Sequence, residues 1–403
     1  MANKKVLHVV NSMDPVLGGV CKAVRIIATS LIQQGVENEV VSLDDSTADF
    51  VLNETFKLHA LGQSNNPWGY HSQLLPWLKS NILNYDYVII HGLWLYNAFA
   101  VYKAFKSIAK KSSINNKCPK YYVMPHGMLD PYFQNASGRR LKAIRNWVYW
   151  KAIENKVVNA SAGLLFTCEE EKLLARKPFN PYHPKSELVV GLGVEAPPKY
   201  EPKMDAAFFS SCDGLQQRPF FLFLSRIHEK KGVDLLVAAY HNILKENQNN
   251  KRIPALVIAG PGGDSDYGKK IKNLVSESES LRHNVFFPGM LSGNAKWGAF
   301  YNCESFILPS HQENFGIAVV ESLACKKPVL ISNQVNIWKE IKAEQGGLID
   351  NDDIKGTASL IKGWINMNSK EKELMENQAE ICYKTYFSLE ALVENWKTKV
   401  FNI

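Results

Sequence analysis

The feature that most limits the fold is a regular alternation of short apolar segments with longer segments of helical periodicity. The apolar segments are three to five residues long and rich in Val, Ile, Leu and Phe, which is typical of buried strands. Alternating strands and helices are typical of parallel sheets with helices on both faces. We predict strands at residues 6–10, 39–43, 87–90, 121–124, 163–166, 188–190, 220–224, 255–259, 284–287, 305–308 and 328–332.

The length of the chain indicates two domains. A chain of 403 residues is too long for one ordinary domain, and each half is large enough to bury its own core. Residues 196–203 are rich in proline and charge, as expected of a linker. We therefore predict an α/β fold with two Rossmann-like, doubly wound domains at residues 1–195 and 204–385, followed by a C-terminal helix at residues 386–403.

Composition excludes several classes of protein. The seven cysteines are scattered without a Cys-x-x-Cys pair, so neither a zinc site nor a disulfide framework is indicated. The sequence contains no apolar run of membrane-spanning length, and its first residues lead into a short apolar strand rather than a signal peptide. We therefore expect a cytoplasmic protein.

The most informative stretch is residues 308–330, which has the pattern of a strand end, a polar loop, a helix that begins after Gly316, and a second strand. Glycine lets backbone approach a ligand, and the N–H groups at a helix start favour an anion. Glu313 and Glu321 flank this helix start, and carboxylates accept hydrogen bonds from sugar hydroxyls. In the simpler interpretation, Glu313 is a solvated loop residue and Glu321 only stabilises the helix dipole.

The residues around the two glutamates resemble a family signature. Glu-x₇-Glu within Pro-Ser-x-x-Glu-x-Phe-Gly, followed by Pro-Val, is similar to the motif of the retaining glycosyltransferases of family 4. This resemblance implies two Rossmann-like domains that face one another, the glycosyltransferase B architecture, with the C-terminal helix crossing back to the N-terminal domain. It also implies that Glu313 contacts the transferred sugar, that Glu321 binds the ribose, and that backbone meets sugar and phosphate at Asn314, Phe315, Gly316 and Ile317.

Two further segments of the second half resemble donor-binding motifs of that family. Arg226 and Lys231 follow a buried strand, and the resemblance implies that their cationic groups grip the diphosphate of the donor, whose charge grows as it leaves. Taken alone, basic residues in a loop are usually solvent-exposed residues without a functional role. Residues 285–291 resemble the loop that holds the nucleotide base, with uracil beside the backbone of Met290 and Leu291.

Two histidines follow apolar strands of the first half, and each could be an ordinary strand-end residue. His126 lies in Pro-His-Gly-Met-Leu-Asp-Pro, which is similar to the exopolysaccharide branch of the family, including cyanobacterial envelope polysaccharide enzymes. The resemblance implies that this histidine reaches the donor sugar, so we expect His126 to be functional and His91 not to be. Gly18 and Gly19 form a Gly-Gly loop that could bring amides near a diphosphate, although a plain tight turn is as plausible.

One acidic pair could suggest a metal. Asp264 and Asp266 have the spacing that some metal-dependent transferases use, but they lie in a glycine-rich loop without other ligands. We interpret them as loop acids and predict no metal and no cofactor. The sequence offers no clear covalent nucleophile, and the family resemblance implies that the leaving phosphate takes the acceptor's proton.

The formal charge of +8 is concentrated in one region, because residues 103–151 hold 11 basic residues and one acid, Asp130. Overlapping this region, the segment Arg139 to Lys156 alternates aromatic and basic residues. One interpretation is an interfacial helix, at Arg139–Lys151, that contacts an anionic membrane. The other is a core stripe of Leu141, Ile144 and Val148 capped by tryptophans, with the charges merely solvated.

These motifs lead to a specific prediction. We expect a metal-independent retaining glycosyltransferase that moves a hexosyl group from a nucleotide sugar, UDP-glucose or similar, to a saccharide or lipid-linked saccharide in exopolysaccharide synthesis, without nucleic-acid partners. It would be cytoplasmic or peripheral at the inner face of the plasma membrane. Two alternatives stay open: a nucleotide-sugar 2-epimerase on the same architecture, and a non-catalytic membrane-associated scaffold.

Overall fold

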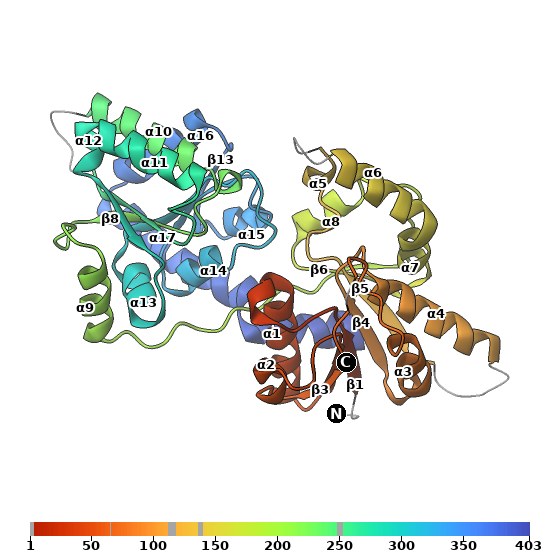
Figure 1. Ribbon diagram of the computed structural model, residues 1–403. Helices are drawn as coiled ribbons and strands as arrows, with labels where there is room; N and C mark the ends of the chain where they lie inside the picture. The colour runs from red at the N-terminus through yellow and green to blue at the C-terminus, as the bar shows by residue number, and fades with distance from the viewer. Residues whose placement is uncertain (1–3, 65, 112–117, 136–139, 248–252) are drawn as a thin grey trace. The chain divides into compact units, whose positions relative to one another are not determined.

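The computed structural model describes residues 4–64, 66–111, 118–135, 140–247 and 253–403 (Figure 1). The chain divides into two compact units, the first formed by residues 1–193 with 389–403 and the second by residues 194–388. These boundaries differ by two or three residues from those expected at 195 and 386. Residues 196–203 belong to the second unit, and their last two residues begin helix α9 (Pro202–Ser211).

The first unit is built on a seven-stranded sheet in the order β3-β2-β1-β4-β5-β6-β7. Every pairing in it is parallel. Strands β4 and β6 are nearly continuous apolar runs, as expected of central strands in a parallel sheet that is covered on both faces. Their bounds are β1 (Lys5–Val9), β2 (Glu37–Ser42), β3 (Lys57–Ala60), β4 (Tyr87–His91), β5 (Lys120–Met124), β6 (Gly163–Phe166) and β7 (Glu187–Val189). Strand β3 was not predicted, because Lys-Leu-His-Ala at an edge lacks an apolar run.

The helices of the first unit include its C-terminal segment. Helix α18 (Leu389–Asn395) packs on α1 (Gly19–Gln33), and the following turn of π-helix (Trp396–Phe401) buries Trp396 completely. The other helices are α2 (Asp49–Leu52), α3 (Leu74–Asn81), α4 (Tyr96–Lys111), α5 (Tyr132–Asn135), α6 (Arg140–Tyr149), α7 (Asn155–Ala160) and α8 (Glu169–Ala175), with a π-helical segment at Trp150–Glu154.

The second unit repeats this scheme with a six-stranded parallel sheet in the order β10-β9-β8-β11-β12-β13. Its strands are β8 (Phe220–Leu224), β9 (Ala255–Ala259), β10 (Val285–Gly289), β11 (Ser305–Leu308), β12 (Val329–Ser332) and β13 (Gly347–Asp350). Its remaining helices are α10 (Val233–Glu246), α11 (Asp266–Glu277), α12 (Glu279–Arg282), α13 (Gly293–Asn302), α14 (Ile317–Ala324), α15 (Trp338–Ala343), α16 (Ile354–Asn366) and α17 (Ser369–Cys382). The predicted α/β class with two doubly wound sheets is therefore confirmed.

Helix α6 does not contain the core stripe that one interpretation of its sequence predicted. The side chains expected to form a core stripe are instead exposed, with 85% of Leu141, 61% of Ile144 and 53% of Val148 accessible. The core residue of this region is Trp150, which is fully buried and stacks on Phe179 with ring centroids 4.9 Å apart. Arg139 lies outside the described residues. No helix in the described ranges is long and apolar enough to cross a membrane.

The pKa values of two buried carboxyl groups in the first unit are shifted in opposite directions. The side chain of Glu154 is completely buried, and the backbone N–H of Trp94 donates to its Oε1 at 2.7 Å. Burial outweighs this hydrogen bond and raises the pKa of Glu154 to about 8. Burial also opposes ionisation of Glu39, but hydrogen bonds from His59, Lys5 and Tyr85 together outweigh it and lower its pKa to about 2.

A Glu154→Gln variant should therefore become relatively more stable as the pH rises. The folded state holds the proton of Glu154 between the unfolded pKa near 4.5 and the folded pKa near 8, so wild-type stability is lost across that range. Relative to pH 4.5, the variant should gain about 1–4 kcal/mol over wild type at pH 9, measured by urea unfolding.

The matched control is Glu39→Gln. Its carboxylate stabilises the fold only where it is ionised, and this contribution is lost as the pH falls through about 2. The difference between Glu39→Gln and wild type should thus stay constant from pH 5 to 9. A pH-independent difference for Glu154→Gln would show that Glu154 is ionised in the fold.

Candidate functional site

In the second unit, the loops that follow β8 and β11 are held together by backbone contacts. These strands are neighbours in a parallel sheet, so both loops leave the same edge. Gly232 has φ 66°, and a Cβ there would lie only 2.1 Å from the carbonyl oxygen of Pro309. The carbonyl oxygen of Lys230 also accepts hydrogen bonds from Ser310 Oγ and His311 N, both at 2.9 Å. The close approach requires glycine at position 232.

This contact brings two predicted site residues together. Lys231 Nζ forms an ion pair with Glu313 Oε2, with 7% of the lysine side chain and 24% of the glutamate side chain exposed. Glu313 is fixed from its other side, because its N–H donates to Gln334 O at 3.0 Å and its carbonyl oxygen accepts from Asn336 N at 2.9 Å. Glu313 is therefore a positioned residue rather than a solvated loop acid. Arg226 follows the same strand as Lys231 and is exposed.

Helix α14 begins where the sequence indicated. Gly316 adopts φ 76° and ψ 68° at its N-cap, and a Cβ there would meet Glu313 Cγ at 3.3 Å. Phe315 is 5% exposed and packs edge-on against Phe387, with ring centroids 5.7 Å apart. The phenyl ring is thus a core group, and a ligand would meet the backbone of Asn314 to Ile317 rather than this side chain.

The second predicted glutamate has a partner that sequence reasoning missed. Glu321 is buried, and its Oε1 lies 2.7 Å from Lys296 Nζ on α13. Lys296 also lies over the ring of Trp297, 4.4 Å from its centroid. No sequence pattern marks Lys296 as this partner, although α13 starts just beyond the predicted base-binding residues Met290 and Leu291. Of these two, Met290 is 74% exposed and Leu291 is 7% exposed.

In the first unit, the predicted glycines lie at the start of α1. Gly18 is its N-cap with φ 95°, and a Cβ at either Gly18 or Gly19 would meet nothing within 4 Å. The preceding residues Val16 and Leu17 are 88% and 68% exposed. The loop thus leaves open space beside its backbone.

His126 lies in a tight turn after β5. His126 and Gly127 both have positive φ, 52° and 78°, and Glu171 fixes the turn by accepting from Gly127 N at 2.6 Å. His91 was expected not to be functional, but its Nδ1 lies 2.9 Å from Nε2 of His126. His91 Nε2 in turn lies 2.9 Å from His8 Nδ1. His91 is therefore a direct partner of the predicted site residue.

Burial governs the protonation of this histidine chain. It lowers the pKa of His126 to about 4. It also lowers the pKa of His8 to about 4, against a smaller opposing effect of the hydrogen bond with Asn38. The pKa of His91 falls well below its usual value through burial and its two histidine neighbours. All three imidazoles are consequently neutral at pH 7.

The acidic pair after β9, which was predicted to lie in a loop, is divided between a loop and the start of a helix. The side chain of Asp264 is 99% exposed and 3.3 Å from Lys272 Nζ, whereas Asp266 is the first residue of α11. In the described part of the chain, no group of three or more His, Cys, Asp or Glu residues is placed to hold a metal ion. The pair alone thus lacks further protein ligands.

The Lys231–Glu313 pair should be energetically coupled. Removing either partner leaves the other with a poorly solvated charge, so Lys231→Met and Glu313→Leu should each destabilise the protein. The double variant should be destabilised by less than the sum of the two single effects. We expect a coupling energy above about 1 kcal/mol in a double-mutant cycle measured by urea unfolding. The control cycle uses Lys203 and Glu201, whose side chains are 60% and 51% exposed and should couple by less than about 0.5 kcal/mol. Equal coupling in the two cycles would contradict a special role for the first pair.

Parts of the chain are similar in sequence to known glycosyltransferases. Residues 213–381 match the family model described as Glycosyl transferases group 1. An uncharacterized glycosyltransferase of Methanocaldococcus jannaschii is 33% identical over 127 residues, which cover 32% of this chain and 30% of that protein. The capsular polysaccharide biosynthesis glycosyltransferase CapM of Staphylococcus aureus is 25% identical over 160 residues, covering 38% and 39%. The chain thus spans less than half of the length of these relatives.

A solved structure extends the likeness to the whole chain. Anabaena HepE in complex with UDP and glucose matches with a TM-score of 0.69 at 16% identity, covering 100% of both chains. At this identity the likeness concerns the fold alone, which is the glycosyltransferase B architecture. Within a chain of that architecture, the match to the glycosyl transferases group 1 model covers residues 213–381.

Proposed function

We propose that this protein is a retaining, metal-independent glycosyltransferase that moves a hexosyl group from a UDP-sugar, such as UDP-glucose, to a saccharide or lipid-linked saccharide acceptor. The observation that carries the proposal is the convergence of Lys231, Glu313 and the start of α14 at the carboxyl ends of neighbouring strands. This is the edge where open α/β sheets bind ligands. The family match of residues 213–381 supports it.

The ion pair suggests how a donor would be received. A diphosphate carries more charge than a carboxylate, so it would replace Glu313 as the partner of Lys231, with Arg226 and the N-terminus of α14 sharing its charge. Glu313 would then be released to accept hydrogen bonds from sugar hydroxyls. The same cationic groups would stabilise the growing charge of the leaving UDP, which is the basis for proposing that no metal and no cofactor are needed.

The other donor contacts follow the predicted motifs. Glu321, held by Lys296 at 2.7 Å, would accept hydrogen bonds from the ribose hydroxyls, and backbone at Met290 and Leu291 would hold the uracil. In the first unit, His126 and the Gly18–Gly19 loop would contact the sugar and the diphosphate or acceptor. The leaving phosphate would take the acceptor's proton on the same face of the sugar.

The biological setting is inferred from the relatives. A complex with UDP and glucose was solved for Anabaena HepE, and the printed name of CapM refers to capsular polysaccharide biosynthesis. Together with the Pro-His-Gly-Met-Leu-Asp-Pro segment, these names favour synthesis of an exopolysaccharide from a cytoplasmic donor.

The proposal predicts UDP binding without metal. In calorimetric titration with chelator present, wild type should bind UDP and UDP-glucose in preference to GDP. Glu321→Ala should weaken UDP binding about tenfold or more, because it removes a charged acceptor of ribose hydrogen bonds. Asp264→Ala is the matched control and should bind as wild type does.

The outcomes separate the alternatives. Absence of binding by every nucleotide would favour the non-catalytic scaffold. Release of free UDP from UDP-sugar with no acceptor present, together with an altered sugar, would favour the 2-epimerase. Binding that requires added Mg²⁺ or Mn²⁺, and that Asp264→Ala abolishes, would overturn the metal-independent mechanism.

We also propose that α6 contacts the inner face of an anionic membrane that carries the acceptor. Its exposed apolar side chains at Leu141, Ile144 and Trp147 lie on one short helix together with Lys142 and Arg145, and this combination favours an anionic lipid surface. The lipid would cover apolar surface that these side chains otherwise expose to water.

Substituting the apolar residues should abolish membrane contact. A Leu141→Glu/Ile144→Glu double variant should lose co-sedimentation with vesicles of phosphatidylcholine and phosphatidylglycerol, because it adds repulsion and removes apolar contact. Leu374→Glu, at a residue of α17 that is 57% exposed, is the control and should co-sediment as wild type does. Equal sedimentation of all three proteins, or of wild type with and without vesicles, would refute the contact.

A further inference from the structure

A chain of hydrogen-bonded side chains crosses the sheet of the first unit and ends at His126. Asn38 belongs to β2, His8 to β1, His91 to β4, and His126 follows β5. These are four consecutive strands in the order of the sheet. The three links each measure 2.9 Å, from Asn38 Oδ1 to His8 Nε2, from His8 Nδ1 to His91 Nε2, and from His91 Nδ1 to His126 Nε2.

The register of the strands explains why these side chains meet. His8 pairs with Val40, two residues beyond Asn38, and with Ile89, two residues before His91. His91 pairs with Met124, two residues before His126. Because side chains two residues apart on a strand share one face of a sheet, Asn38, His8 and His91 lie on the same face. The 2.9 Å link to His91 brings His126, in the turn beyond β5, to that face as well. Each link therefore advances two residues toward the carboxyl edge, where His126 lies.

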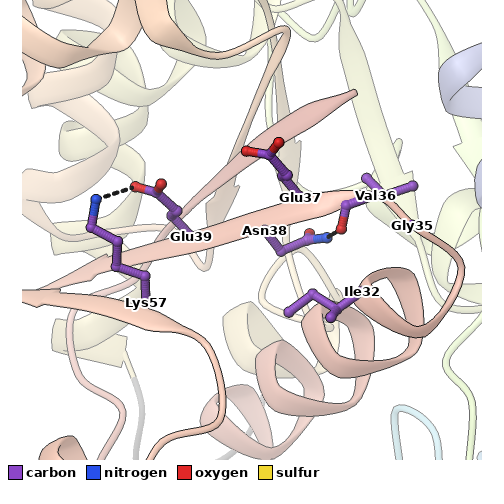
Figure 2. Close-up of a pocket in the computed structure, with 7 residues that line it drawn as sticks. All are labelled: Ile32, Gly35, Val36, Glu37, Asn38, Glu39 and Lys57. Atoms are coloured by element: carbon purple, nitrogen blue, oxygen red, sulfur yellow. Dashed lines mark hydrogen bonds and ion pairs between the residues drawn. The ribbon is translucent and has the colours of Figure 1, made fainter. Parts of the chain in front are cut away.

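The orientation of Asn38 sets the direction of the chain. Its amide Nδ2 donates to the carbonyl oxygen of Val36 at 2.9 Å, as the dashed line in Figure 2 shows. The opposite orientation would place two acceptor oxygens together. Oδ1 of Asn38 is therefore the atom that faces His8, and it can only accept, so Nε2 of His8 carries the proton.

The remaining tautomers follow in sequence. A neutral His8 with its proton on Nε2 has a bare Nδ1, which accepts from Nε2–H of His91. His91 is then bare at Nδ1 and accepts from Nε2–H of His126. This leaves Nδ1 of His126 as a lone-pair nitrogen. The low pKa values of the three rings agree with this neutral state.

We propose that Asn38, His8 and His91 are positioning residues that fix His126 as a hydrogen-bond acceptor, whose Nδ1 receives a hydroxyl hydrogen of the sugar substrate. The chain thus defines the polarity of the contact: this site selects a group that can donate. The substrate part of this inference rests on the proposed function, whereas the tautomers do not.

The tautomers can be read directly in the free protein. Nitrogen NMR of protein labelled with ¹⁵N-histidine at pH 7.5 distinguishes protonated from bare ring nitrogens, and single His→Gln variants assign the signals. We expect His8, His91 and His126 each to be neutral, with protonated Nε2 and bare Nδ1. A proton on Nδ1 of His126, or a cationic His126, would overturn the proposal.

Substitutions along the chain test the positioning role. His91→Gln keeps one donor and one acceptor between its neighbours, whereas His91→Leu keeps neither. We expect His91→Leu to lower kcat for sugar transfer about tenfold or more with UDP affinity unchanged, and His91→Gln to restore most of it. Asn38→Leu should also lower kcat and populate the other tautomer of His8. It removes the orienting amide beside a surface pocket of about 340 Å³ (Figure 2).

The control is His59→Gln, because His59 pairs in register with Val41 on the opposite face of the sheet and bonds Glu39 at 2.7 Å. It should leave kcat and the three tautomers unchanged. Equal losses in His91→Gln and His91→Leu would reduce the chain to a packing role. If the protein shows the expected tautomers but neither binds UDP nor transfers sugar, the hydrogen-bonded chain of side chains is supported and the proposed function is refuted.

Discussion

Parallel pairing of the described strands is the constraint on which the rest of this structure depends. When all strands of a sheet run in one direction, their exit loops must gather at a single edge. In the second unit that edge joins the loops after β8 and β11, and the carbonyl oxygen of Lys230 then fixes Ser310 and His311 between them. The Lys231–Glu313 pair follows from this backbone arrangement, although 82 residues separate its members in sequence.

The same geometry explains which parts of the fold were predictable. Apolar runs such as Phe220–Leu224 and Ser305–Leu308 predict buried parallel strands by composition alone, and the loops that follow them contain Arg226 and Gly316. Strand β3 could not be recognised, because an edge strand needs no apolar run and its pairing with β2 supplies what its sequence lacks. Local patterns thus predict central strands better than edges.

Motifs could not predict contacts between side chains on different elements of the fold. Lys296 and Glu321 lie 25 residues apart, and nothing in either helix alone shows that they meet. From sequence alone, an isolated strand-end histidine such as His91 is expected to bond only to backbone. Only the register of β1, β4 and β5 shows that His91 lies between His8 and His126. For helix α6, the sequence pattern suggested contacts that do not form. Leu141 and Ile144 have the spacing of core residues, but both side chains are exposed.

The return of residues 389–403 to the first unit makes the second unit an insertion within the first. The polypeptide passes between the units twice, near Gly193 and again near Ser388. A gene fragment encoding residues 194–388 would therefore contain one whole unit, whereas no continuous fragment without it contains the other. The two units are therefore joined by two segments of the polypeptide. Any change in their relative orientation must change the backbone conformation of both segments together.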